Sequence, residues 1–337
     1  MSVDLSTVYL SLELRNPIVA SSGPLTGNLA SLQRLEEAGV GAVVLPSLFE
    51  EQIVHDQLEV ERLYEFHADA NAESLDFFPE LNDQYSTPNA YLQRLEDAKR
   101  RLSIPVIASL NGASDGGWID YARQIESAGA DALELNLYFV PTDPEMSSAD
   151  VEQRYVDLVA KVRDSIQIPL AVKIGAQFSA LPHFAGQLAL AGADGLVLFN
   201  RYLEPDIDLD RLHIKPELVF SQPFESRASL RWIAILRDQL PTVSLAATSG
   251  VHSSETAAKL LLVGADAVMM TCALITHGPG FVTKVVAELA DWMVEKEYDS
   301  VGQLRGSMSR DNTPDASALE RANYVQTLAE FTSRHVV

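Results

Sequence analysis

The chain has 337 residues, 47% of them hydrophobic, and its 47 acidic against 25 basic residues give a formal net charge of −22. Such a surface repels nucleic acids and anionic membranes, and no apolar run is long enough to span a bilayer, so we expect a soluble, cytoplasmic protein without nucleic-acid or membrane partners. The single cysteine, Cys272, excludes an internal disulfide framework and a multi-cysteine metal centre.

Strands and helices alternate along the sequence, which we expect to form one domain over residues 1–337. Residues 6–16 alternate in polarity and predict an N-terminal strand or hairpin that plugs the bottom of a barrel. Short apolar runs predict strands at 17–20, 42–45, 105–110, 132–137, 168–174, 195–200, 243–247 and 267–270. Helical spacing of apolar residues predicts helices at 29–38, 91–102, 117–128, 149–165, 181–191, 230–240 and 253–263.

Two segments interrupt this alternation, residues 46–88 and 201–227. The first begins with a helical pattern over residues 49–66 and continues as an irregular stretch that contains aromatic residues. Both segments are longer than ordinary loops, and loops of such length are commonly functional. We therefore predict insertions after the second and sixth strands.

A short phrase, Ala-Gly-Ala-Asp or a close variant, recurs at residues 128–131, 191–194 and 263–266. Its glycine can adopt the left-handed conformation that closes a helix, and the turn then leads into the next parallel strand. Right-handed crossovers of similar length predict a (β/α)8 TIM barrel. A doubly wound open sheet is the alternative fold.

Small and polar residues follow the predicted strands, and in a barrel these carboxyl ends face one site. Asn111, Asn136 and Asn200 carry amides that suit a planar heterocycle, although a single asparagine after a strand is commonly a turn residue. Lys173 ends an apolar strand and needs a partner, either a ligand or a carboxylate such as Glu134. The full set is Ser22-Gly23, Pro46-Ser47, Asn111-Gly112, Asn136, Lys173, Asn200, Ser249-Gly250 and Thr271-Cys272.

The last two predicted strands end in Thr248-Ser249-Gly250 and Thr271-Cys272-Ala273. Because the phosphate site of many barrels lies after strands 7 and 8, at helix N-termini, these turns are candidate phosphate ligands. The alternative is a βαβ unit whose small residues serve packing alone. The seven histidines lack metal-ligand spacing and no Gly-x-Gly-x-x-Gly motif is present, so we expect neither a metal site nor a Rossmann-type nicotinamide site.

Five motifs spread over nearly the whole chain carry a family resemblance. They are Asn-Pro-Ile-Val-Ala-Ser-Ser-Gly at 16–23, Glu-Leu-Asn-Leu at 134–137, Ala-Val-Lys-Ile at 171–174, Asn200, and Thr-Ser-Gly-Val at 248–251. Together they resemble the dihydroorotate dehydrogenase family, which consists of barrels that use FMN. The resemblance implies that FMN contacts Ser22, Gly23, Asn136, Lys173, Asn200, Ser249, Gly250, Cys272 and Ala273, and that the substrate contacts Asn111, Asn136 and Asn200.

The sequence departs from that family where substrate chemistry takes place. After Glu-Leu-Asn-Leu the family has Ser-Cys-Pro-Asn, whereas Phe139, which cannot accept a proton, stands at the position of the catalytic base. Loss of a general base slows a reaction by roughly 10²–10⁴-fold. Tyr138, Ser147 and Ser148 are weak substitutes. Ser249 also replaces a glycine of the family's phosphate turn, although a serine hydroxyl can itself donate to phosphate.

These patterns predict an FMN-dependent oxidoreductase of the CH–CH type, similar to the dihydroorotate dehydrogenases of pyrimidine metabolism, with a different substrate or proton path. The alternative is a flavin-poor or catalytically silent barrel that acts as a binding or assembly subunit of a redox complex. The expected partners are a small pyrimidine-like heterocycle, a redox partner protein and further copies of the chain in a homo-oligomer.

Overall fold

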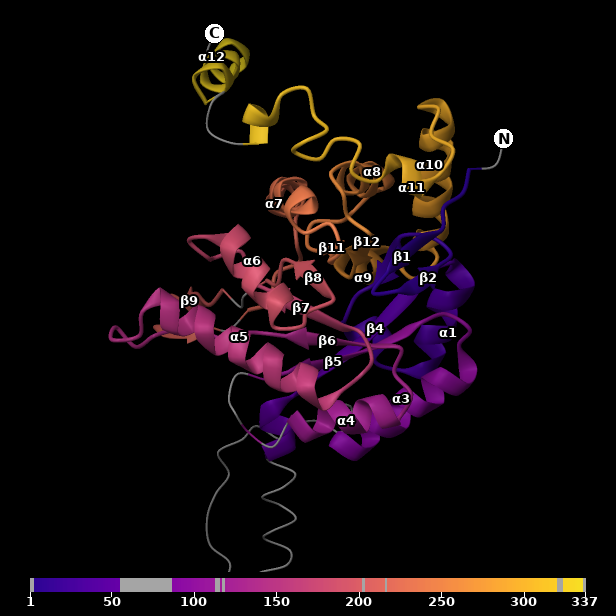
Figure 1. Cartoon of the computed structure of the whole chain (residues 1–337), viewed down its shortest axis with the longest axis vertical. Coiled ribbons are helices and arrows are strands. Elements are labelled where there is room, and N and C mark those ends of the chain that lie inside the picture. Colours follow the sequence, from indigo (N-terminus) through magenta and orange to yellow (C-terminus); the bar gives the residue numbers. More distant parts are fainter. Residues whose placement is uncertain are drawn as a thin grey trace, which may run out of the picture.

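A computed structural model of the chain describes residues 3–54, 87–112, 116, 119–201, 204–215, 217–319 and 324–335. Eight parallel strands close into a barrel with the order β11-β12-β3-β4-β5-β6-β7-β8 (Figure 1). This confirms the (β/α)8 barrel and is incompatible with an open doubly wound sheet. The barrel strands are β3 (Ile18–Ala20), β4 (Ala42–Phe49), β5 (Val106–Asn111), β6 (Ala132–Asn136), β7 (Leu170–Ile174), β8 (Gly195–Leu198), β11 (Ser244–Ala247) and β12 (Ala267–Met270).

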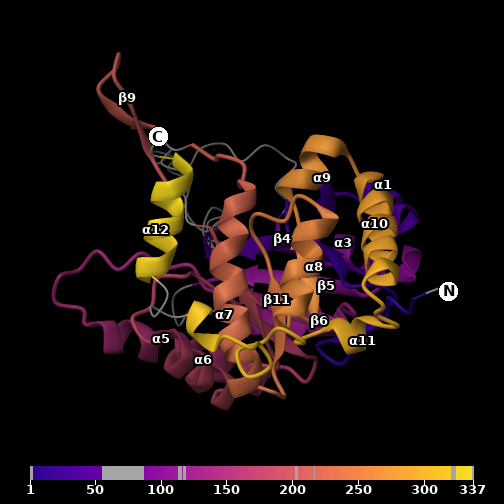
Figure 2. The same ribbon diagram turned by 90° about the horizontal axis from the view of Figure 1, so that it is seen from above.

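Helices surround this barrel, and α7, α8 and α10 run side by side along one flank (Figure 2). Between the strands lie α1 (Leu29–Ala38), α3 (Pro88–Arg101), α4 (Ile119–Ser127), α5 (Ser148–Ser165), α6 (Leu181–Leu190), α7 (Ser226–Gln239) and α8 (Ser254–Leu262). After β12 follow α9 (Cys272–His277), α10 (Phe281–Glu295), α11 (Val301–Leu304) and α12 (Tyr324–His335). No helix in these described ranges is long and apolar enough to cross a membrane.

The N-terminal hairpin plugs the bottom of the barrel, as the sequence predicts. Its strands β1 (Thr7–Tyr9) and β2 (Leu12–Leu14) pair antiparallel, and Leu10 and Ser11 between them have φ values of 53° and 60°, as a type I′ turn requires. Leu10 is buried, and its backbone N–H donates to Ser244 Oγ at 3.0 Å. Its side chain packs against Gly195, where an added Cβ would lie only 2.6 Å from Leu10 Cδ2. The bottom of the barrel is therefore filled by side chains.

Tyr9 belongs to the same interior cluster and is fully buried. Its hydroxyl has no hydrogen-bond partner among the described residues. Burial, reinforced by the negative charges of Glu134 and Asp266, raises the pKa of the Tyr9 phenol well above its ordinary value of 10.0. Tyr9 therefore stays protonated in the folded protein at any ordinary pH.

The recurring Ala-Gly-Ala-Asp phrase closes α4, α6 and α8 before the next strand. Gly129, Gly192 and Gly264 have φ values of 92°, 104° and 115°, which confirms the left-handed helix ends. The aspartate of each phrase has a structural role that the sequence did not predict. Its carboxylate accepts a hydrogen bond from a backbone N–H near the start of the preceding strand, together with one from a cation of the helix before that strand.

These bonds are all between 2.6 and 3.0 Å long. Charge-assisted hydrogen bonds of this kind are about twice as strong as neutral ones, so each aspartate ties two neighbouring strands and a helix together. Asp266 is the most buried of the three and also contacts Arg305. The sets are Asp131 with Val106 and Lys99, Asp194 with Leu170 and Arg163, and Asp266 with Leu245 and Arg237.

The predicted end of the second strand at Leu45 was wrong, because β4 runs through Pro46 to Phe49. Proline cannot donate to the strand ladder, and the pairing of β4 with β5 shifts register between Val44 and Ser47 to accommodate it. Residues 50–54 are helical, and the rest of the helix predicted over 49–66 lies outside the described residues.

The insertion after β8 contains a second hairpin that the sequence did not predict, formed by β9 (Asp206–Asp208) and β10 (His213–Lys215). It projects from the barrel, as Figure 2 shows at the β9 label. Several of its large apolar side chains are more than half exposed, namely Ile207, Leu209, Leu212 and Ile214.

Candidate functional site

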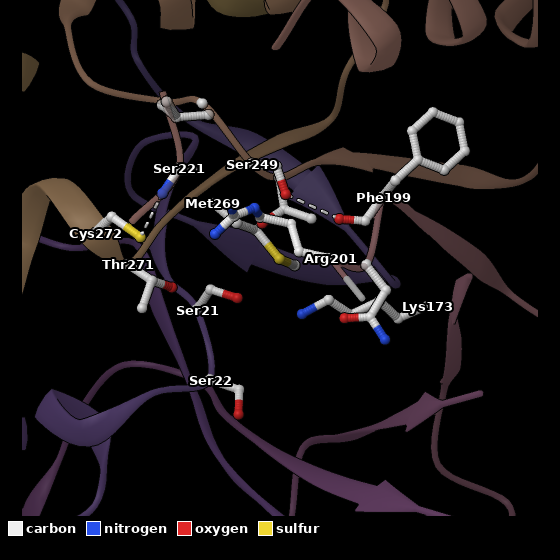
Figure 3. Close-up of a pocket in the computed structure, with 14 residues that line it drawn as sticks. Ser21, Ser22, Lys173, Phe199, Arg201, Ser221, Ser249, Met269, Thr271 and Cys272 are labelled. Carbon is white, nitrogen blue, oxygen red and sulfur yellow. Dashed lines mark hydrogen bonds between the residues drawn. The ribbon is translucent and has the colours of Figure 1, made fainter. Parts of the chain in front are cut away.

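A cavity of about 160 Å³ lies at the carboxyl ends of the barrel strands (Figure 3). It is bounded by the segments that follow β3, β8, β11 and β12 and by side chains of β7 and β12. Within the part of the chain that the structure describes, no acidic residue lines it. The lining residues are Ser21, Ser22, Lys173, Phe199, Asn200, Arg201, Ser221, Thr248, Ser249, Gly250, Val251, Met269, Thr271 and Cys272.

Most of the predicted site residues meet at this cavity, since Ser22, Lys173, Asn200, Ser249, Gly250 and Cys272 all line it. Gly23, Asn111, Asn136 and Ala273 are not among the lining residues. A Cβ on Gly23 would be 2.7 Å from Cγ2 of Thr271, so the glycine allows these two strand ends to approach closely. Asn111 pairs in register with Asn136 on the neighbouring strand and is buried.

Lys173 pairs with a carboxylate, which is one of the two partners that the sequence left open, and it also lines the cavity. Its Nζ lies 3.5 Å from Glu134 Oε1, and the two side chains are 10% and 1% exposed. Neither oxygen of Glu134 has a hydrogen-bond partner among the described residues, so the contact is an ion pair without hydrogen-bond geometry. An ammonium group has three donors, and this loose pairing leaves Lys173 able to bind a ligand.

Two asparagines form a polar pair beside Lys173. Asn200 Nδ2 donates to Asn136 Oδ1 at 2.7 Å, and Asn136 stands in register with Lys173 on the adjacent strand. An amide has two donor hydrogens and an acceptor oxygen. The bond therefore leaves the pair with further donors and an acceptor for a ligand.

The turn after β11 is held tightly by its neighbours. Ser249 and Gly250 have φ values of 71° and 73°, and a Cβ on Gly250 would lie 2.5 Å from the backbone nitrogen of Ser226. The Ser249 hydroxyl donates to the carbonyl of Phe199 at 3.0 Å, so its single proton is engaged within the protein. Thr271 gives α9 no side-chain cap, which leaves the first backbone N–H groups of α9 available to an anion.

Ser221 joins three of the segments around the cavity. Its backbone N–H donates to Cys272 Sγ at 3.4 Å, and its hydroxyl lies 3.1 Å from His252 Nε2. Sequence reasoning did not assign Ser221, Phe199, Arg201 or Met269 to the cavity. Arg201 directly follows the predicted strand-end residue Asn200, and this position was the available signal.

The family's catalytic-base position lies outside the lining of the cavity. Phe139 packs against the core, its ring is 4.3 Å from Cζ of Arg154, and its carbonyl accepts a hydrogen bond from the Tyr155 hydroxyl at 3.3 Å. Ser147 forms the N-cap of α5 in a capping box with Asp150.

The structure does not bring the weak substitutes to the cavity. Tyr138 is half-buried without being among the lining residues, and Ser148, the first residue of α5, is exposed like the Ser147 cap. The hydroxyls that do line the cavity belong instead to Ser21, Ser22, Ser221, Thr248, Ser249 and Thr271.

A closed (β/α)8 barrel with one polar, cationic cavity at the carboxyl ends of its strands defines a barrel enzyme. Comparison with known proteins gives the family. The model of the family "Dihydroorotate dehydrogenase" matches residues 4–293, so the chain belongs to the dihydroorotate dehydrogenase family. Members of this family are FMN-binding oxidoreductases that act on CH–CH bonds, and the chain is a dihydroorotate dehydrogenase-like oxidoreductase.

The similarity to individual relatives is low but extends over most of each chain. The catalytic subunit of dihydroorotate dehydrogenase B (NAD(+)) from Methanothermobacter thermautotrophicus is 24% identical over 318 residues, which are 90% of this chain and 97% of the relative. The same subunit from Methanosarcina acetivorans is 26% identical, over 88% of this chain and 93% of the relative. The NAD-dependent dihydropyrimidine dehydrogenase subunit PreA of Escherichia coli K12 is 24% identical, over 96% of this chain and 81% of the relative.

Proposed function

We propose that this chain is an FMN-dependent oxidoreductase of a small pyrimidine-like heterocycle other than dihydroorotate. The observation that carries the proposal is the absence of a proton acceptor at Phe139, whose ring packs beside Arg154, while the hydroxyl of Ser147 serves to cap α5. The cationic cavity with its asparagine pair supports a flavin and a polar ring as its ligands.

The residues of the cavity fit FMN in their chemistry. Lys173 is only loosely paired with Glu134, so its ammonium group can donate to an electron-rich ring edge. The backbone around Gly250 and the uncapped start of α9 would hold the phosphate. FMN supplies hydride transfer to or from a substrate carbon when it is bound. The protein contributes binding, orientation and the positive charge of Lys173.

The asparagine pair favours a ring with adjacent amide-type groups. The bond from Asn200 to Asn136 fixes both side chains, and the remaining amide hydrogens and the Asn200 oxygen can meet carbonyl and N–H groups in one plane. A site built to hydrogen-bond such groups rejects analogues without them, because its buried polar groups would be left unpaired.

Two measurements on the purified chain test this proposal. We expect the visible absorbance of bound flavin, and release of FMN on denaturation. With dihydroorotate as substrate we expect turnover roughly 10²–10⁴-fold below that of an enzyme with an intact base. Turnover of a 5,6-dihydropyrimidine that lacks the carboxylate is measured on the same protein as the matched comparison. Normal turnover of dihydroorotate would contradict the inference that the absence of a base at Phe139 slows this reaction.

A silent barrel is the second candidate, and the size of the cavity favours it. Ligand pockets commonly measure about 300–1,000 Å³, and the cavity of about 160 Å³ is smaller. A colourless protein that does not take up added FMN would establish this alternative and remove the first. Uptake of FMN with a stoichiometry near one per chain would exclude it.

We also propose that the chain forms a homo-oligomer through its β9–β10 hairpin. Stable dimers bury about 800 Å² per partner, and large apolar side chains of this hairpin such as Leu209 and Leu212 are about 80% exposed. Light scattering on the wild type and on Leu209→Ser/Leu212→Ser tests this, and a monomeric wild type contradicts it.

Since two relatives are named as subunits of larger enzymes, we propose a separate redox partner as well.

A further inference from the structure

The charge of the cavity differs from that of the molecule. The chain carries a net charge of −22, yet Lys173 and Arg201 are the only charged residues among the described ones that line the cavity. Lys173 has a carboxylate beneath it, whereas Arg201 enters from the segment after β8. Each of these cations is paired with a carboxylate that does not line the cavity, Lys173 with Glu134 and Arg201 with Glu225, so the lining itself presents positive side chains to an anionic ligand.

Arg201 is held in place at the edge of this cavity. Its Nη1 donates to the carbonyl of Val219 at 2.5 Å, its Nη2 donates to Glu225 Oε1 at 3.3 Å, and its Nε lies 3.1 Å from Glu225 Oε2. A guanidinium has five N–H donors, so these contacts leave donors for a ligand. The side chain is 36% exposed, and Figure 3 shows it reaching across the cavity toward Ser221 and Cys272.

Arg201 therefore approaches the turns that are proposed to hold the phosphate. At those turns the hydroxyl of Ser249 is already committed to the carbonyl of Phe199, so it donates nothing to a phosphate. Lys173 lies at the other side of the cavity in the same view. The positive side chain on the phosphate side is thus Arg201, and a guanidinium matches phosphate oxygens in a fork of two parallel bonds.

On the basis of the proposed FMN function, we infer that Arg201 is a ligand of the cofactor phosphate, a side-chain contact added to the backbone cradle. Val219 and Glu225 hold the guanidinium at the rim of the cavity and leave some of its donors without a protein partner among the described residues.

The test compares FMN with riboflavin, which lacks the phosphate. Fluorescence titrations on flavin-free full-length protein measure both affinities for the wild type, Arg201→Gln and Arg201→Lys. We expect Arg201→Gln to weaken FMN binding about 10- to 100-fold, with riboflavin binding changed less than about twofold, and Arg201→Lys to lie between. Arg211→Gln on the exposed β9–β10 turn is the control for the same change of net charge and should bind both flavins like the wild type.

Each opposite result has a definite meaning. Equal loss of FMN and riboflavin affinity in Arg201→Gln would show a structural effect and overturn the assignment. Tighter FMN binding would show that Arg201 blocks the cavity and would also overturn it. Binding of FMN by the wild type with no change in Arg201→Gln refutes the phosphate contact and leaves the FMN function standing, whereas a wild type that binds neither flavin removes the proposed function itself.

Discussion

The buried pair of Lys173 and Glu134 allows the structural and cofactor roles of the lysine to be separated. Lys173→Ala leaves a carboxylate that is 1% exposed and has no hydrogen-bond partner among the described residues. Removal of one partner of a buried ion pair costs about 3–5 kcal/mol, because the remaining charge is uncompensated. We therefore expect the free energy of unfolding of flavin-free Lys173→Ala to fall by that amount in urea titrations.

A second substitution relieves this cost without restoring the lysine. In Lys173→Ala/Glu134→Gln the buried group is neutral, so we expect most of the lost stability to return. The matched control is Lys284→Ala, which breaks an exposed pair with Glu288 and should cost at most about 0.5 kcal/mol. Stability of Lys173→Ala equal to that of the wild type would refute the argument from burial.

Flavin binding then decides the cofactor role. If Lys173 contacts the flavin, the double variant regains stability but still binds FMN more weakly than the wild type, because the positive charge is absent from the cavity. A double variant with the FMN affinity of the wild type would show that the lysine serves only to neutralise Glu134. Measurement of both quantities on the same samples keeps a folding defect from being taken for a binding defect.

Further expectations concern the barrel itself, each checked by urea unfolding. Ser11→Gly should stabilise the protein by up to about 1 kcal/mol, since Ser11 is exposed and has a positive φ. Asp266→Ala should cost about 3–5 kcal/mol and the more exposed Asp194→Ala about 1–3, and a reversed order would contradict the weight given to burial. Above pH 10.0 only the unfolded state releases the proton of Tyr9, so stability should fall by up to about 1.4 kcal/mol per pH unit, and Tyr9→Phe should reduce that slope.

Local chemistry made several features predictable from the sequence. The glycines of the repeated phrase needed a left-handed conformation at helix ends, and all three have it. Lys173 at the end of an apolar strand needed a polar environment, and it lies between Glu134 and the cavity. In these cases the physical requirement arises within one short segment, so the pattern of residues is sufficient to find it.

Other features depend on contacts between distant segments. A carboxylate in a turn resembles a surface residue, and nothing near Asp131 in the sequence shows that it accepts the N–H of Val106, 25 residues earlier. The place of Arg201 depends on Val219, 18 residues later in an irregular segment. Pro46 argued for the end of a strand, but a shift in pairing carried β4 past it.

The three aspartates of the repeated phrase also bear on how the barrel opens. Each one joins the beginnings of two successive strands, so β5 with β6, β7 with β8, and β11 with β12 cannot separate without breaking a charged contact. Native-state hydrogen exchange should therefore group the protected amides of Val106, Leu170 and Leu245 with those of the following strand. Motion of the barrel wall then occurs two strands at a time, in units smaller than the whole fold.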